Sequence, residues 1–383
     1  MIPRVGALVL AAESSPKVDG FAPLLPIRGS TALGLAVRAL RRAGVDDMVV
    51  LAGRDALEVH AEAARLGLGC VSGLAGAGGL PRVRAALDAL PDGLDGVVFM
   101  PADRPLVRPA TIRALAESLG GRPVVRPVFR GERGKPVLAA AQALSSIGSW
   151  SAASGLEGAL EALEALHGAE EVPVADSNIL LGIGTGEDYR EAMRRVRRME
   201  RPSPEEARAL LEMRGMDARG MEHAGTVARV ALALARALSD ARGWPLDMEF
   251  VQASALMLEL GAGRGSGAVR AGRALESAGF PEAARIVRTG GDASLDPASP
   301  ITEREVAVLA GRLVHCGGLV PLGRRYREKL ERHGRDPAAR EALAARRDAA
   351  LALQARLEAE AGMTVREIMA VEGLFMPRDQ AGD

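Results

Sequence analysis

The chain has 383 residues, more than one hydrophobic core normally supports, so we expect two domains. Its 49 basic and 49 acidic residues cancel, and only 3% of its residues are aromatic. The balanced charge argues against a nucleic acid or an anionic membrane as the main partner, and the shortage of rings argues against base stacking. Local basic patches remain compatible with this composition.

Cysteine usage and hydropathy indicate a cytoplasmic protein. Cys70 and Cys316 are the only cysteines and lie far apart, so neither a disulfide framework nor a cysteine-rich metal site is expected. The apolar run at 5–12 is short and is followed at once by polar residues, which favours a buried first strand over a signal peptide. No stretch approaches the roughly 20 apolar residues of a membrane span.

Residues 5–198 alternate short β-rich runs with longer helical patterns, which predicts an α/β domain with a Rossmann-like, mostly parallel sheet. The expected strands are 5–12, 47–53, 68–71, 96–101, 123–129, 135–139 and 171–175. The expected helices between them are 30–43, 56–66, 80–90 and 109–119. In such a sheet, ligands bind at the carboxyl ends of the strands.

The strand signal disappears after a boundary near residue 200, where Ser203 is a good N-cap between two prolines. We therefore expect one domain at 1–200, an all-α domain at 201–376 and a disordered tail at 377–383. The helices expected in the second domain are 204–213, 218–241, 249–260, 266–278, 281–289, 302–316, 321–333 and 337–361.

Five ordered segments of the first domain resemble the MobA-like nucleotidyltransferases. LVLAA at 8–12 is similar to the family's first strand before its nucleotide loop, and the segment at 23–53 continues through the first helix and second strand. FMPADRPLV at 99–107 resembles the aspartate signature, FRGERGKPVLAA at 129–140 the substrate loop, and GIGTGEDYREA at 182–192 the closing segment. Each match is weak alone, but their order is specific.

The resemblance implies transfer of CMP or GMP from CTP or GTP to molybdopterin, with Mg²⁺ holding the phosphates. It places Asp103 at the catalytic metal and the nucleotide at Ala11, Ala12, Glu13, Lys17 and Asp103. The family's nucleotide loop needs positive charge and bare backbone amides. Most of that positive charge is missing from this loop, and among the positions compared with the family only Lys17 is positively charged.

Substitutions in the nucleotide loop predict weak or lost catalysis. Glu13 replaces a family glycine, and Val18 and Asp19 replace Met-Gly. Ala22 stands where the family has a lysine that contacts phosphate. A carboxylate about 4 Å from a phosphate would cost a few kcal/mol at an effective dielectric of roughly 20. Glu13 would therefore impair NTP binding if its side chain points into the loop. Alternatively, the side chain points outward or holds the metal.

The second metal ligand of the family is also replaced. Gly182 and Gly184 occupy the two aspartate positions of the closing segment, which leaves Asp176 and Asp188 as substitutes out of register. Asp188 is better explained as a helix cap. Asp103 can hold Mg²⁺ between protein and phosphate, and its alternative role is that of a turn or cap residue.

The acceptor side of the resemblance falls on a basic hairpin. Lys135 stands where many relatives have histidine, and with Arg130 and Arg133 it would contact the acceptor's phosphate. The alternative is a solvated basic hairpin with no ligand.

The second domain resembles the HD phosphohydrolase fold through MEHAGTVARVALALARALSD and VQASALMLELGAGRG. That fold holds a metal with a histidine, a His-Asp pair and a later aspartate. His223 matches the first ligand, but Glu259 and Leu260 replace the pair and Gly311 replaces the last aspartate. His223 is thus an orphan ligand, and we predict no phosphohydrolase activity.

Three hypotheses follow. The chain is a nucleotidyltransferase of molybdenum cofactor metabolism, a catalytically inactive partner in the maturation of a molybdoenzyme, or a sugar-phosphate nucleotidyltransferase. The helical domain would serve in homodimer formation, docking or nucleotide sensing. Retention of the apolar framework with loss of phosphate and metal contacts favours reduced catalysis, although a fold alone does not establish a function.

Overall fold

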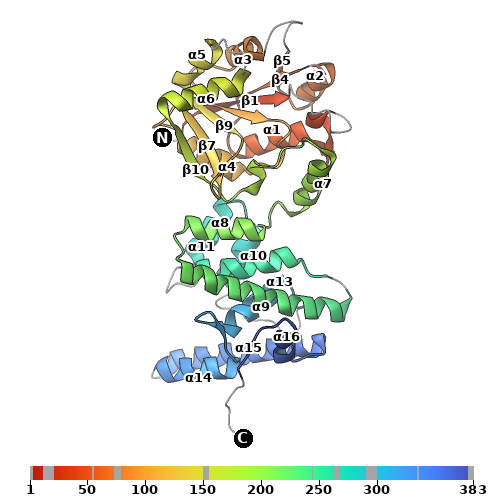
Figure 1. The fold of residues 1–383 in the computed structure, drawn as a ribbon, viewed down its shortest axis with the longest axis vertical. Coiled ribbons are helices and arrows are strands. Elements are labelled where there is room, and N and C mark those ends of the chain that lie inside the picture. Colours follow the sequence, from red (N-terminus) through yellow and green to blue (C-terminus); the bar gives the residue numbers. More distant parts are fainter. Residues whose placement is uncertain are drawn as a thin grey trace. The chain divides into compact units, whose positions relative to one another are not determined.

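The computed structural model describes residues 3–11, 21–53, 56–72, 79–149, 155–243, 245–261, 267–289, 300–333 and 336–377. The chain divides into two compact units, Met1–Met199 and Glu200–Asp383. The first unit holds the large sheet and the second is helical (Figure 1). The predicted disordered tail, 377–383, lies almost wholly outside the described residues.

The described residues of the first unit form an eight-stranded sheet in the order β10-β7-β9-β6-β1-β4-β5, with β8 paired to β7. Its strands are β1 (Val5–Ala11), β4 (Met48–Ala52), β5 (Gly69–Ser72), β6 (Gly96–Pro101), β7 (Val124–Phe129), β8 (Glu132–Arg133), β9 (Val137–Ala140) and β10 (Ala169–Pro173). A separate small hairpin joins β2 (Pro26–Ile27) to β3 (Ser30–Thr31).

The sheet is mostly parallel, as predicted. β1 pairs in parallel with both β4 and β6, β4 with β5, and β10 with β7. Only β8 and β9 run antiparallel to their partners, so β9 begins at the edge of the sheet where β6 ends. Each strand expected from the sequence is present within a few residues of its predicted bounds.

Helices cover both faces of this sheet (Figure 1). Alternate residues of β1 face opposite ways: Ala7 and Val9 join one core with α1, α2 and α4, and Leu8 joins a second core with α3, α5 and α6. The helices of this unit are α1 (Ala32–Arg42), α2 (Ala56–Arg65), α3 (Gly79–Asp88), α4 (Pro109–Glu117), α5 (Ala141–Ser149), α6 (Gly155–His167) and α7 (Gly186–Arg195), with short 3₁₀ turns η1 (Ala22–Leu24), η2 (Ser177–Ile179) and η3 (Val196–Arg198).

Several short elements were not anticipated. The strands β2, β3 and β8 have two residues each, too few to show a period, and α5 and α6 were not drawn from the sequence. A third apolar cluster packs the β2–β3 region against α7, with Ile27 and Ile183 fully buried or nearly so. This cluster attaches the closing segment to the rest of the unit.

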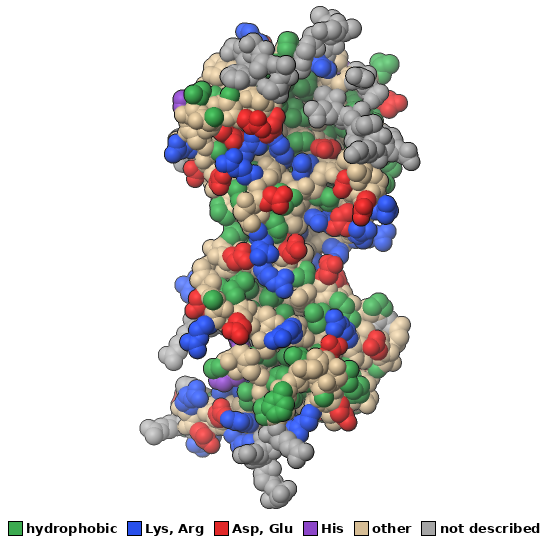
Figure 2. All heavy atoms as spheres, in the orientation of Figure 1, with side chains coloured by type: hydrophobic (Ala, Val, Ile, Leu, Met, Phe, Trp, Pro, Cys, Tyr) green, Lys and Arg blue, Asp and Glu red, His purple; other side chains and the backbone are tan. Residues whose placement is uncertain are grey.

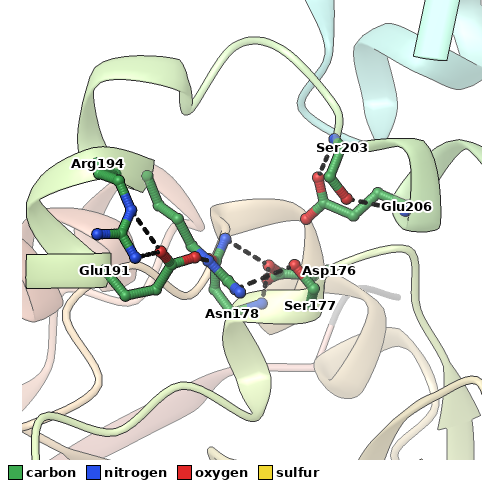
Figure 3. A network of polar contacts seen from close by, with 8 residues as sticks. Asp176, Ser177, Asn178, Glu191, Arg194, Ser203 and Glu206 are labelled. Atoms are coloured by element: carbon green, nitrogen blue, oxygen red, sulfur yellow. Dashed lines mark hydrogen bonds and ion pairs between the residues drawn. The ribbon is translucent and has the colours of Figure 1, made fainter. Parts of the chain in front are cut away.

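The second unit is built around the long helix α9, against which α10, α13, α15 and α16 pack. Its helices are α8 (Pro204–Met213), α9 (Ala218–Arg242), α10 (Met248–Met257), α11 (Gly267–Ser277), α12 (Pro281–Thr289), α13 (Glu303–Leu313), α14 (Leu322–His333), α15 (Pro337–Ala361) and α16 (Val365–Val371), with the 3₁₀ turn η4 (Leu258–Gly261). Ser203 caps α8 in a capping box with Glu206, which confirms the predicted helix start (Figure 3).

The second unit is helical, as predicted, with a short β-hairpin added to its helices. A hairpin of β11 (Val314–His315) and β12 (Gly318–Leu319) follows α13. Its turn holds Cys316 at φ 49° and Gly317 at φ 79°, both left-handed, as a two-residue hairpin turn requires. The helical spacing of the sequence predicts a helix as far as residue 316, three residues beyond the end of α13, so it does not indicate this turn. Among the described helices, none combines the length and apolarity needed to cross a membrane.

The buried position of Leu8 predicts a large loss of stability on truncation. Leu8→Ala removes a fully buried side chain between β1 and the helices on one face, so we expect the free energy of unfolding of the first unit to fall by about 2–5 kcal/mol. Urea denaturation followed by circular dichroism measures it. Leu57→Ala is the control, because Leu57 is 87% exposed and its loss should change that free energy by less than about 0.5 kcal/mol.

Candidate functional site

The candidate site lies where β1 and β6 end. Leu10 pairs with Pro101, and the backbone N–H of Ala102 donates to the Leu10 carbonyl at 2.9 Å. The turn that carries Asp103 is thereby held beside the start of the nucleotide loop. Because β9 runs antiparallel to β6, the chain just before Val137 reaches the same edge of the sheet. Residues from three separate segments meet there.

Most of the predicted nucleotide loop lies outside the described residues, including Ala12, Glu13 and Lys17. Ala11 ends β1 with its side chain fully buried, so at this position only the backbone faces the edge of the sheet. Ala22, where the family has a lysine, is 2% exposed and packs in the apolar cluster with Ile27. Position 22 therefore serves the core of this chain.

Asp103 and Gly182 are neighbours in space. A Cβ atom placed on Gly182 would lie 3.2 Å from Oδ2 of Asp103 and 3.4 Å from the guanidinium carbon of Arg104. The backbone N–H of Ile183 donates to the Asp103 carbonyl at 2.9 Å and ties the two segments together. An acidic side chain at position 182 would thus stand directly beside the Asp103 carboxylate, and in this chain glycine leaves that place without one.

Asp176 does not take over the role of the missing carboxylate. It is 1% exposed and accepts hydrogen bonds from the backbone N–H of Arg108 and the hydroxyl of Thr111, both at 2.7 Å. It also caps η2 by accepting from the N–H of Asn178 (Figure 3). A buried carboxylate held by this many donors stabilises the fold.

Asp188 is likewise held in its own helix. Its Oδ2 accepts from the Thr185 hydroxyl at 2.8 Å and from the backbone N–H of Gly184 at 3.2 Å, at the start of α7. This agrees with the expected helix cap. Within the described ranges no group of three or more His, Cys, Asp or Glu is placed to hold a metal ion. A single carboxylate such as Asp103 can bind Mg²⁺ when the substrate's phosphates supply further ligands to the same ion.

A cluster of positive charge lies beside Asp103. Lys135 Nζ forms an ion pair with Glu157, and Arg126 Nη2 contacts the other oxygen of Glu157 at 2.8 Å. Arg104 Nη1 and the backbone N–H of Lys135 both donate to the Ile179 carbonyl, at 2.9 and 3.0 Å. Figure 2 shows Lys and Arg side chains gathered next to acidic ones on the visible face of this unit.

The ionisation of this cluster depends on burial and on Glu157. Burial lowers the pKa of Lys135 below its usual value, Glu157 opposes that shift, and Arg126 and Arg104 add repulsion. Burial raises the pKa of Glu157, but Lys135 and Arg126 outweigh it and the pKa is lowered overall. Glu157 therefore acts as the counterion that keeps the partly buried lysine charged.

The other two basic residues of the hairpin are placed differently. Arg130 and Gly131 form the turn between β7 and β8 at φ 50° and 88°, and Arg130 is exposed. Arg133 contacts Glu171 at 2.6 Å and Glu164 at 3.3 Å. Lys135 alone among the predicted acceptor residues lies in the cluster beside Asp103.

Arg104, Arg126 and Glu157 were missed from the sequence. Arg104 directly follows Asp103 in the aspartate signature, so the sequence places it close to the predicted site. Nothing in the surrounding sequence indicates that it lies near Lys135. Arg126 and Glu157 lie 31 residues apart on β7 and α6, and only the packing of that helix on the sheet joins them. Arg126 also binds Glu164 on the same helix and is nearly fully buried.

In the second unit, two residues of the expected HD-like pattern come together. His223 Nε2 on α9 lies 3.4 Å from Glu259 Oε1 on η4, and the backbone N–H of Gly317 donates to His223 Nδ1 at 3.1 Å. The two ring nitrogens of His223 thus face different partners, Nδ1 the backbone N–H of Gly317 and Nε2 the carboxylate of Glu259. A Cβ on Gly311 would meet Leu258 at 3.5 Å, so the position of the last aspartate is lined by apolar atoms.

Comparison with known families supports the first unit only. Residues 7–168 match the family model of the MobA-like NTP transferase domain. Over these residues the first unit is thus similar to MobA-like NTP transferase domains, as predicted. No curated protein matches the chain. The family match ends before the second unit begins, and the HD-like character of that unit stays a prediction.

Solved structures similar to the chain include two of Rv0371c from Mycobacterium tuberculosis H37Rv. The first is 26% identical with a TM-score of 0.45 and covers 51% of this chain and 99% of that one. The second, a complex with manganese, is 26% identical with a TM-score of 0.43 and covers 50% and 98%. A cytidylyltransferase from Leptospira borgpetersenii is 20% identical with a TM-score of 0.42 and covers 50% and 85%.

Removal of the Glu157 charge should lower the pKa of Lys135 further. In Glu157→Gln the burial of Lys135 and the repulsion from Arg126 remain while the attraction disappears, so we expect the pKa to fall below its wild-type value. A pH titration of ¹³Cε-labelled lysine by NMR measures it. Glu171→Gln, which removes an acid that pairs with Arg133, should leave it nearly unchanged. An unchanged or higher pKa in Glu157→Gln would show that Glu157 is not the counterion.

Proposed function

We propose that the first unit transfers a nucleoside monophosphate from an NTP to a phosphorylated acceptor. The observation that carries the proposal is that Arg104, the residue after Asp103, and the backbone N–H of Lys135 both donate to the Ile179 carbonyl, in a unit whose residues 7–168 match a nucleotidyltransferase family. An acidic group for a metal and a partly buried cationic cluster for phosphate are the two elements this chemistry needs.

In the proposed reaction a phosphate oxygen of the acceptor attacks the α-phosphorus of the NTP in line. The new P–O bond forms as the bond to the β-phosphate oxygen breaks, and pyrophosphate leaves with its electron pair. A divalent metal, when bound, would neutralise charge on the triphosphate. Asp103 would hold that ion from the protein side.

Lys135 would bind the acceptor's phosphate. Its present counterion, Glu157, has a side chain 45% exposed, so an incoming dianion is able to compete for the lysine from the solvent side. Arg104 is held by the Ile179 carbonyl through Nη1, which leaves other N–H groups of its guanidinium for a second contact. We expect Arg126, which is buried against Glu157 and Glu164, to position Glu157 without contacting substrate.

The molybdopterin acceptor implied by the resemblance remains the first candidate, with CTP or GTP as donor. A sugar phosphate is the alternative, and both would use the same metal and the same lysine. The two acceptors are distinguished by which of them supports release of pyrophosphate.

A second candidate function is nucleotide binding without transfer, as in a partner protein of molybdoenzyme maturation. The observation in its favour is Gly182: the place beside Asp103 carries no second carboxylate. With one protein ligand, a metal ion would be held mainly by the substrate's phosphates and by water. The assay below separates the two candidates.

Turnover requires Asp103. We expect release of pyrophosphate from CTP or GTP, dependent on Mg²⁺ or Mn²⁺ and on a phosphorylated acceptor, and a decrease in kcat/KM of at least about 100-fold in Asp103→Asn. A coupled pyrophosphate assay measures it. The control is Asp92→Asn, an exposed aspartate outside the site. If the wild type releases no pyrophosphate with any acceptor yet binds an NTP in calorimetry, the partner function replaces the transferase.

A second carboxylate placed beside Asp103 should strengthen metal binding. Gly182→Asp would put its side chain next to Asp103 Oδ2, and we expect Mn²⁺ to bind at least about tenfold more tightly, measured by electron paramagnetic resonance titration. Gly121→Asp is the matched control, because a Cβ there meets nothing within 4 Å. Equal Mn²⁺ affinity in wild type and Gly182→Asp, with the fold intact by circular dichroism, would mean that Asp103 does not face a metal position.

A further inference from the structure

Basic side chains from three helices gather on the second unit, where α13 and α14 both pack against α15. They are Arg312 in the last turn of α13, Arg325 and Lys329 one turn apart on α14, and Arg346 on α15. Arg325 and Lys329 are four residues apart, so they share one face of their helix. We refer to Arg312, Lys329 and Arg346 as the α13–α15 basic cluster.

Hydrogen bonds within the unit hold one of these guanidinium groups and leave another unsatisfied. Arg325 Nη1 donates to the carbonyls of Gly311, Arg312 and Val314, at 3.0, 2.7 and 2.5 Å, and so closes the end of α13. In contrast, Nη1 of Arg312 is buried and has no hydrogen-bond partner among the described residues. A buried donor without a partner is costly, so its retention calls for a ligand that the protein itself does not supply.

Lys329 also has no acidic partner. Its Nζ lies 5.7 Å from the ring centre of the buried Tyr326, and in the described part of the chain no carboxylate forms an ion pair with it. The nearby acid on the same helix, Glu328, is held by Arg324 at 3.0 Å. Lys329 therefore rests on an aromatic ring with its charge uncompensated.

The cations of the cluster repel one another. Burial lowers the pKa of Lys329 first, and Arg325, Arg312 and Arg346 lower it further. Burial also lowers the pKa of Arg312, with added repulsion from Arg346. Glu259, the acid beside His223, attracts Arg325, but burial outweighs it and the pKa of Arg325 is lowered as well. These three helices thus bring several positive charges close together, and among the described residues no carboxylate forms an ion pair with Arg312 or Lys329.

We propose that the α13–α15 basic cluster binds a small phosphate-bearing anion. A phosphate or pyrophosphate group offers several acceptor oxygens and more than one negative charge, so one compact ligand can satisfy Arg312 and neutralise Lys329, and Arg346 adds a third positive charge nearby. Cations contributed by three neighbouring helices suit such a compact ligand. The site lies wholly within the second unit and does not depend on the transferase proposed for the first.

Calorimetric titration of the full chain with inorganic pyrophosphate, in buffer with EDTA and constant ionic strength, tests this proposal. We expect the wild type to bind, and Lys329→Gln and Arg346→Gln each to weaken the affinity by at least about tenfold, the loss of one charge-assisted contact. Arg327→Gln is the matched control: it removes the same charge from an exposed position of α14. Titration with orthophosphate shows whether one phosphate group is sufficient.

Two further variants separate this site from the first unit. Lys135→Gln should leave unchanged the component of pyrophosphate binding that Lys329→Gln weakens, because Lys135 belongs to the other unit. Loss of binding in Lys135→Gln but not in Lys329→Gln would overturn the proposal, as would an equal loss in Arg327→Gln or no binding by wild type. Circular dichroism and thermal melting of each variant verify that it is folded, and Arg346→Gln, at an exposed position, is the least disruptive of the set.

Discussion

The parallel pairing of β1 with β6 is the constraint on which the candidate site depends. It places the turn after β6 beside the end of β1, and a single backbone hydrogen bond from Ala102 to Leu10 holds the turn there. Ile183 then binds the Asp103 carbonyl and brings the closing segment to the same place. Because β9 is antiparallel to β6, Lys135 arrives at this edge from the opposite direction. Asp103 owes its position to the pairing of β1 with β6, and Lys135 owes its position to the pairing of β9 with β6.

Charge is distributed unevenly around that edge. The buried Arg126 is compensated by two glutamates of α6, and one of them also compensates Lys135. Beside Asp103, in contrast, position 182 contributes no charge at all. The carboxylates that are nearest in sequence, Asp176 and Asp188, are held by backbone and hydroxyl donors. The cations that we propose for phosphate binding are thus retained more fully than the carboxylates that would hold a metal ion.

The second unit also gathers cations in one place, on α13, α14 and α15. At the position of the HD-fold metal site, which the sequence predicts to be lost, His223 meets Glu259 and a backbone amide, and an apolar side chain lies beside Gly311. Arg325 closes the end of α13, and Lys329 of the α13–α15 basic cluster forms no ion pair with a described carboxylate. Both units therefore present cations suited to phosphate, although they build them on different frameworks.

The sequence by itself determined the mostly parallel sheet, the helical second unit and the start of α8, because hydrophobic period and capping chemistry are local properties. It also indicated the MobA-like family and the importance of Asp103. It did not reveal the hairpin after α13, since a two-residue strand has no period. Only the tertiary structure decided that Gly182 lies against Asp103, that Asp176 is buried, and that Glu157 reaches Lys135 and Arg126. The residues of these pairs are 22 to 79 positions apart in the sequence. Such residues come into contact only when the strands and helices that carry them have packed together.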